Sequence, residues 1–155
     1  MRAQFELLSA IRDRLSEAHV AVMTIRDVKA QATELGDRAV RLGMGDGLKT
    51  KAKALGDKLT AIEMKLINPD IKGLEDDLNY PPRLDHDLTF LAGVVGSADR
   101  APTASSRKMY DDLAQRLGAI RAELKGVLDG DLADFNRAVQ TAGVPPVAAS
   151  PKIER

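Results

Sequence analysis

Apolar residues recur at steps of three and four along two long segments, one near each end of the chain. In the first segment the stripe consists of Leu8, Ile11, Leu15, Ala18, Val22, Ile25, Ala32, Leu35, Ala39 and Leu42. In the second it consists of Tyr110, Leu113, Leu117, Ile120, Leu124, Val127, Phe135 and Val139. This spacing places the apolar side chains on one face of an α-helix, so each segment is predicted to be an amphipathic helix. At about 40 residues, each helix spans roughly 60 Å.

Two shorter helices are predicted between the long ones. We expect helices over residues 3–42, 46–67, 84–98 and 103–142. Glycines at 43, 45 and 47 end the first, and Gly143 ends the last, because glycine is the usual residue just after a helix. Thr103 fits the N-cap of the last helix, or Pro102 its first turn. Residues 1–147 are predicted to form a single all-α domain, and residues 148–155 a flexible tail.

Each short helix carries its own apolar stripe. The stripe of the second helix consists of Leu48, Ala52, Leu55, Leu59, Ile62 and Leu66. In the third helix, Leu84, Leu88, Leu91 and Val95 form one face, and Phe90 and Val94 are expected to widen it. The small residues Ala92, Gly93 and Gly96 predict a close approach of another backbone.

The helix lengths favour one topology, an elongated antiparallel bundle. Setting the two short helices end to end makes them a broken middle helix between the long pair. In the alternative, an up-down-up-down four-helix bundle, half of each long helix lacks a partner unless the chain dimerises. Exposed apolar stripes are unfavourable at ~25 cal/mol per Å², so we prefer the broken-middle arrangement.

Composition and charge exclude several classes of protein. Lysine plus arginine equals aspartate plus glutamate at 23 each, so the basic excess of a nucleic-acid binder is missing. Aromatic residues make up 3% and cysteine is absent, which disfavours an aromatic-walled ligand pocket and excludes thiolate chemistry. No apolar run approaches the ~18 residues of a membrane span. The charged N-terminus lacks the apolar stretch of a signal peptide. The absence of cysteine leaves the compartment open, because a bundle of this size needs no disulfide.

No group of residues predicts catalysis or metal binding. His86 lies between Asp85 and Asp87, but adjacent side chains on a helix point in different directions, so a helix-start cluster is the better interpretation. His19 lacks the preceding glutamate of a Glu-x-x-His metal motif. Residues 43–47 lack the preceding strand and the glycine spacing of a dinucleotide loop. We therefore predict no enzyme, no cofactor and no metal site.

The segment between the short helices, together with the first turn of the third helix, is the candidate interaction surface. It contains Asn79, Tyr80, Pro81, Arg83 and His86. Tyr80 lies beside prolines, where it can plug a helix junction or, in the alternative, contact a partner protein, because tyrosine is enriched at interfaces.

Several stretches of the chain resemble the C-terminal helical region of bacterial sortilin-like, BNR-repeat β-propeller proteins, a family often labelled "glycosyl hydrolase". The match is densest over Leu78-Asn79-Tyr80-Pro81 and Leu91-Ala92-Gly93-Val94-Val95, and it closes with Ala142-Gly143-Val144-Pro145-Pro146. The resemblance implies a non-catalytic accessory module whose partner is a β-propeller absent from this chain. The hydrolase label would belong to that propeller. The alternative is an independent protein–protein adaptor or a self-associating bundle; in neither case is nucleic acid a partner.

Overall fold

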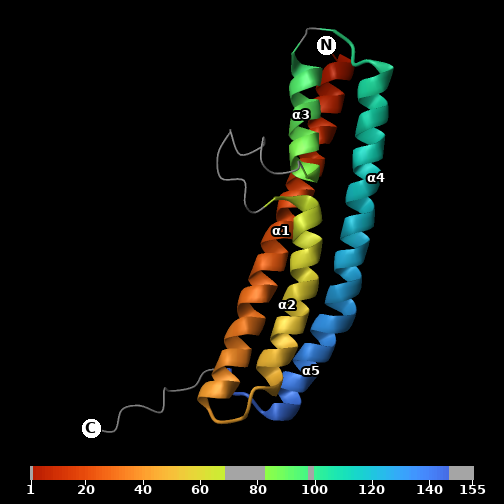
Figure 1. Cartoon of the computed structure of the whole chain (residues 1–155). Coiled ribbons are helices and arrows are strands. Elements are labelled where there is room, and N and C mark those ends of the chain that lie inside the picture. The colour runs from red at the N-terminus through yellow and green to blue at the C-terminus, as the bar shows by residue number, and fades with distance from the viewer. Residues whose placement is uncertain (1, 69–82, 98–99, 147–155) are drawn as a thin grey trace, which may run out of the picture. The chain divides into compact units, whose positions relative to one another are not determined.

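The computed structural model describes residues 2–68, 83–97 and 100–146, and these residues are helical apart from turns (Figure 1). Within them there is no β-strand. The helical elements in chain order are α1 (Arg2–Arg41), α2 (Gly47–Leu66), α3 (Leu84–Gly96), α4 (Ala104–Val127), η2 (Leu128–Leu132) and α5 (Ala133–Ala142). The predicted all-α class, with two long helices, two shorter ones and antiparallel packing, is confirmed. The tail predicted at 148–155 lies outside the described residues.

The helix ends follow the glycine and threonine signals of the sequence. Gly43 and Gly45 have φ angles of 74° and 82°, and Gly143 has 68°, which is the left-handed conformation that glycine adopts without strain. Thr103, rather than Pro102, begins the last long helix, because its Oγ1 accepts a hydrogen bond from the Ser106 amide at 3.1 Å.

The last long helix is continuous, as predicted, but it changes its winding. A π-helical segment, η2, replaces the α-helical hydrogen-bonding pattern between α4 and α5. The π turn contains Gly130 and has no buried residue. Its presence was not predicted, since the apolar spacing around it fits an ordinary helix.

The chain forms two compact units. The first comprises Met1–Thr24 and Ala61–Leu124, and the second comprises Ile25–Thr60 and Lys125–Arg155. Each unit therefore contains a stretch of both long helices. Helix α3 belongs to the first unit, and most of α2 belongs to the second. The two short helices thus pack with different stretches of the long helices.

In the first unit, α3 lies beside the amino-terminal part of α1 and beside α4 (Figure 1). The Gln4 side chain amide donates a hydrogen bond to the Val95 carbonyl at 2.9 Å, which joins the start of α1 to the end of α3. Helix α3 thus runs opposite to α1. Its four-residue stripe faces inward, since all four side chains are buried. The buried apolar residues of this unit are Leu7, Ile11, Ala18, Ala21, Val22, Ile62, Leu66, Leu84, Leu88, Leu91, Val95, Leu113, Leu117 and Leu124.

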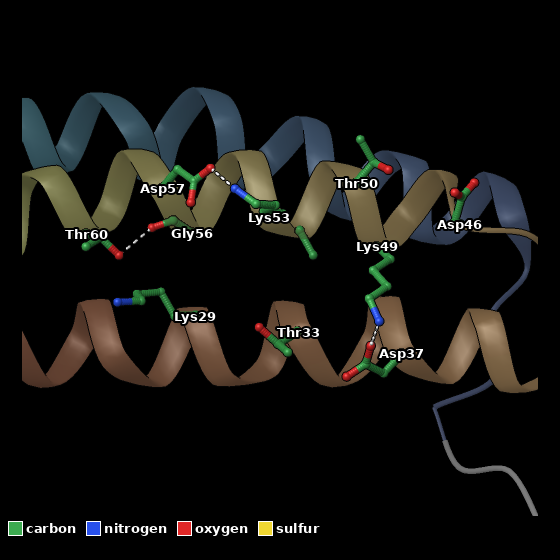
Figure 2. Close-up of a pocket in the computed structure, with 11 residues that line it drawn as sticks. Lys29, Thr33, Asp37, Asp46, Lys49, Thr50, Lys53, Gly56, Asp57 and Thr60 are labelled. Carbon is green, nitrogen blue, oxygen red and sulfur yellow. Dashed lines mark hydrogen bonds and ion pairs between the residues drawn. The ribbon is translucent and has the colours of Figure 1, made fainter.

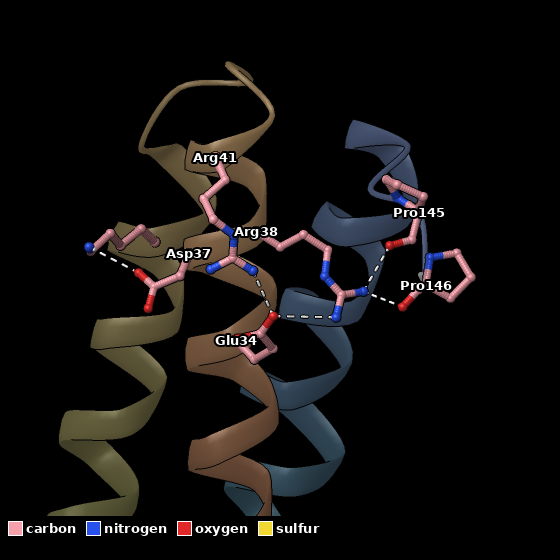
Figure 3. A network of polar contacts seen from close by, with 7 residues as sticks. Glu34, Asp37, Arg38, Arg41, Pro145 and Pro146 are labelled. Atoms are coloured by element: carbon pink, nitrogen blue, oxygen red, sulfur yellow. Dashed lines mark hydrogen bonds and ion pairs between the residues drawn. The ribbon is translucent and has the colours of Figure 1, made fainter. Parts of the chain in front are cut away.

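In the second unit, α2 lies beside the later turns of α1 and beside α5 (Figure 1). Its buried apolar residues are Ile25, Ala32, Ala39, Leu48, Ala52, Leu55, Leu59, Phe135 and Val144. Polar contacts join the end of the chain to α1: the Arg38 Nη1 donates to the Pro145 carbonyl at 3.0 Å and also to that of Pro146 (Figure 3). Glu34 accepts from both Arg41 and Arg38 in the same network.

Two expectations about the third helix are wrong. Phe90 and Val94 do not widen its buried face, since their exposed fractions are 59% and 46%. Gly93 and Gly96 allow no close backbone approach either, because a Cβ at either position would meet no atom within 4 Å. The neighbouring helices cover only the central stripe of α3.

Candidate functional site

The structure places part of the predicted interaction surface at the start of α3. Asn79, Tyr80 and Pro81 lie outside the described residues. Arg83 precedes α3 with an extended backbone (φ −118°, ψ −175°) and makes no side-chain cap hydrogen bond. His86 is half-buried in the first turn, where its amide donates to Asp85 Oδ1 at 2.8 Å. Asp85 thus accepts one hydrogen bond within the first turn of α3.

Arg83 lines a pocket of about 410 Å³ within the first unit. The described residues around this pocket come from the end of α2, the start of α3 and the middle of α4. They are Lys65, Arg83, Arg116, Ala119, Ile120 and Glu123. Three of the six are cationic and two are apolar. The pocket therefore combines positive charge with a hydrophobic wall.

Two of the three cations already have anionic partners. Lys65 pairs with Glu123 at 2.7 Å, and Arg116 pairs with Asp87 of α3 at 3.1 Å. Among the described residues no carboxylate pairs with Arg83, and its Nε is buried without a hydrogen-bond partner. An unsatisfied buried donor is costly, about 1–3 kcal/mol, which an added acceptor near the guanidinium would reduce in part. The pocket thus has one positive charge in excess, at Arg83.

An exposed apolar pair lies on the face of α3 that carries Asp87. Phe90 and Val94 are four residues apart on one face of the helix, and Asp87 precedes Phe90 by about one turn on that face. Asp87 is also the ion-pair partner of the pocket residue Arg116. Phe90 and Val94 therefore share an α3 face with Asp87, which is tied to the pocket through Arg116. We call these nine residues the Arg83 surface: the six pocket residues together with Asp87, Phe90 and Val94.

A larger groove of about 570 Å³ lies within the second unit, between α1 and α2 (Figure 2). Its lining residues are Lys29, Thr33, Asp37, Asp46, Lys49, Thr50, Ala52, Lys53, Gly56, Asp57 and Thr60. Lys49 pairs with Asp37 across the groove at 3.0 Å, and Lys53 pairs with Asp57 along α2 at 2.6 Å. Three lysines balance three aspartates, so this groove, unlike the Arg83 pocket, has no excess charge.

A search of residues 2–68, 83–97 and 100–146 finds no group of three or more His, Asp or Glu side chains arranged to hold a metal ion. His19 is exposed on α1 and His86 is half-buried on α3. In the same part of the chain, no helix combines the length and the apolar character that crossing a membrane requires.

No protein-family model matches the chain, and no curated protein or solved structure is significantly similar to it. The resemblance to the propeller-associated helical region stays a prediction.

Sequence reasoning identified Arg83 and His86 but missed Lys65, Arg116 and Glu123. These three residues lie far from Arg83 along the chain, and only the packing of α2, α3 and α4 brings them together. No spacing pattern in the sequence links these three residues to Arg83.

Proposed function

We propose that this chain is a non-catalytic helical module that binds another protein. The observation that carries the proposal is the distribution of its phenylalanines. Only Phe135 is in the core, at 4% exposure, whereas Phe5 is 72% exposed and Phe90 is 59% exposed. A chain with so few aromatic residues places two of its three phenylalanines in contact with water.

Protein interfaces account for such exposure in physical terms. Burying apolar surface is favourable by about 25 cal/mol per Å², and phenylalanine and methionine are enriched in interface cores. Met23 on α1 is 69% exposed and Val20 is 61% exposed, so the outer face of α1 adds to the apolar surface of the first unit. A scattered exposed leucine needs no explanation, but exposed aromatic rings of this size favour a binding role.

The partner class follows from the resemblance described above. A β-propeller domain is the proposed partner, with a second copy of this chain as the alternative. Co-expression of this chain with a propeller from the sortilin-like family tests the first. Sedimentation at increasing protein concentration tests the second, because self-association doubles the mass of 16.7 kDa.

Site-specific photo-cross-linking tests the proposed function itself. A photoreactive phenylalanine analogue replaces Phe5 or Phe90 in the organism that encodes the chain, and the exposed position Ser105 of α4 is the matched control. We expect protein adducts from Phe5 or Phe90 and none from Ser105. Equal labelling at all three positions, or no adduct at any of them, would contradict a binding role for these surfaces.

A further inference from the structure

The Arg83 surface combines two features that one ligand can satisfy together. Among the described residues, no carboxylate pairs with Arg83 in its pocket, whereas the other two cations form ion pairs, and the same side of the molecule presents Phe90 and Val94 of α3 to solvent. The pocket itself includes Ile120, which is half-buried, and Ala119. A ligand with a carboxylate alone would leave the apolar part uncovered, and an apolar ligand alone would bury Arg83 further without a partner.

We infer that the Arg83 surface binds an acidic, amphipathic segment of a partner protein. A glutamate or aspartate of that segment pairs with Arg83, and an apolar side chain about one helical turn away packs on Phe90 and Val94. This inference rests on the proposed binding function and names the site and the chemistry of the partner.

Charge complementarity favours an acidic protein segment over other ligands of this surface. Arginine suits carboxylates because its planar guanidinium presents several donors in a fixed fork. A free phosphate would use the cation but gain nothing from Phe90 and Val94. The groove of the second unit is larger, but its charges are balanced by its own residues, so it selects no charged partner.

The start of α3 adds only a little to this preference, because its first turn already carries Asp85 and Asp87. Arg83 lies at the N-cap position of a 13-residue helix, where the helix dipole favours negative charge. A carboxylate bound there is close to both the guanidinium and the positive end of the helix. The effect of the helix end is small by itself, about 0.3–1 kcal/mol.

Selection from a display library of random peptides of about twelve residues tests the inference on the full chain. We expect the enriched peptides to combine aspartate or glutamate with a leucine, phenylalanine or other large apolar residue. Binding of a synthetic copy is then measured by fluorescence polarisation. Arg83→Glu is expected to weaken it by about tenfold or more, and the weakening by added salt should be smaller in that variant.

A charge exchange separates recognition from a structural effect. A peptide with lysine in place of its glutamate should bind Arg83→Glu better than it binds the parent chain. If the Arg83→Glu variant does not fold, Arg83→Gln replaces it in the binding measurement, with its helicity checked by circular dichroism. Arg107→Glu, at an exposed position of α4 in the same unit, is the matched control and should change binding less than twofold.

The outcomes distinguish the two proposals. Peptides that bind but are insensitive to Arg83, or that carry no acidic residue, overturn the inference and leave the binding module intact. Enriched peptides that match the sequence of this chain would indicate a second copy as the ligand, and this result would also overturn the inference. If no peptide is enriched, the inference fails; if cross-linking at both Phe5 and Phe90 also yields no adduct, the proposed function fails with it.

Discussion

A Cβ atom placed on Gly36 would lie 2.8 Å from the Cα of Lys49, which is closer than real Cβ atoms approach backbone carbons. Gly36 is in the interior of α1, where glycine is ordinarily unfavourable by up to about 1 kcal/mol relative to alanine. The close crossing of α1 and α2 within the second unit explains its presence, because no side chain fits between the two backbones.

Gly36→Ala should therefore destabilise the protein although alanine is the better helix former. Overpacking a close contact typically costs about 1–3 kcal/mol, which exceeds the gain in helix propensity. We expect a net loss of about 1–2 kcal/mol in the free energy of unfolding, measured by urea denaturation. Gly56→Ala in α2 is the control, because a Cβ there meets no atom within 4 Å. It should be neutral or stabilising, and a loss in both variants would contradict the steric explanation.

The two environments of phenylalanine predict opposite effects of the same substitution. Phe135→Ala removes a ring that is 4% exposed in the second unit, and such truncations cost about 3–5 kcal/mol. Phe90→Ala removes a ring that is 59% exposed, and it should change the free energy of unfolding by less than about 0.5 kcal/mol. Thermal unfolding of both variants measures the difference. A large loss of unfolding free energy in Phe90→Ala would show that this ring stabilises the fold and would argue against its role as a contact for a partner.

The buried faces of the helices could be predicted from the sequence because helical period alone decides which residues share a face. All six residues of the predicted α2 stripe, from Leu48 to Leu66, are buried. The width of a buried face cannot be predicted in this way, since it depends on how many neighbouring helices cover the helix. Phe90 and Val94 border the α3 stripe, and no periodicity could show that they remain exposed.

Close contacts and the candidate site depended on partners that are distant in sequence. Gly93 and Gly96 looked like the sites of close packing, yet Gly36 has that role because α2 crosses α1 there. Arg83 was chosen for its place in an irregular segment. Its pocket partners Lys65 and Arg116 belong to other helices, and only the folded chain shows that both of them, unlike Arg83, are neutralised by acids.

Thr103 caps the start of α4, so its substitution should change the free energy of unfolding measurably. Its Oγ1 accepts the Ser106 amide hydrogen bond at 3.1 Å and lies 3.0 Å from the Ser106 hydroxyl. Thr103→Ala should lower the free energy of unfolding by about 1 kcal/mol, because the first helical amides lose an acceptor. Ser105→Ala, at an exposed position of the same turn, is the control and should have almost no effect. Thr103→Ser should retain most of the stability, and equal losses in all three variants would argue against a cap.

The network around Glu34 predicts a pH dependence whose sign follows from its contacts (Figure 3). The hydrogen bond from Arg41 at 2.8 Å and its charge are the main cause that lowers the pKa of Glu34 below its ordinary value of 4.5, and Arg38 contributes less. A carboxyl whose pKa is lower in the folded state stabilises the fold above pH 4.5 and loses that contribution as the pH falls through its folded pKa. Side-chain NMR titration should show the pKa of Glu34 rising toward 4.5 in Arg41→Gln, and rising less in Arg38→Gln. The larger rise in Arg38→Gln would reverse this ranking, and it would mean that the arginine bound to the Pro145 carbonyl, not Arg41, dominates the carboxylate.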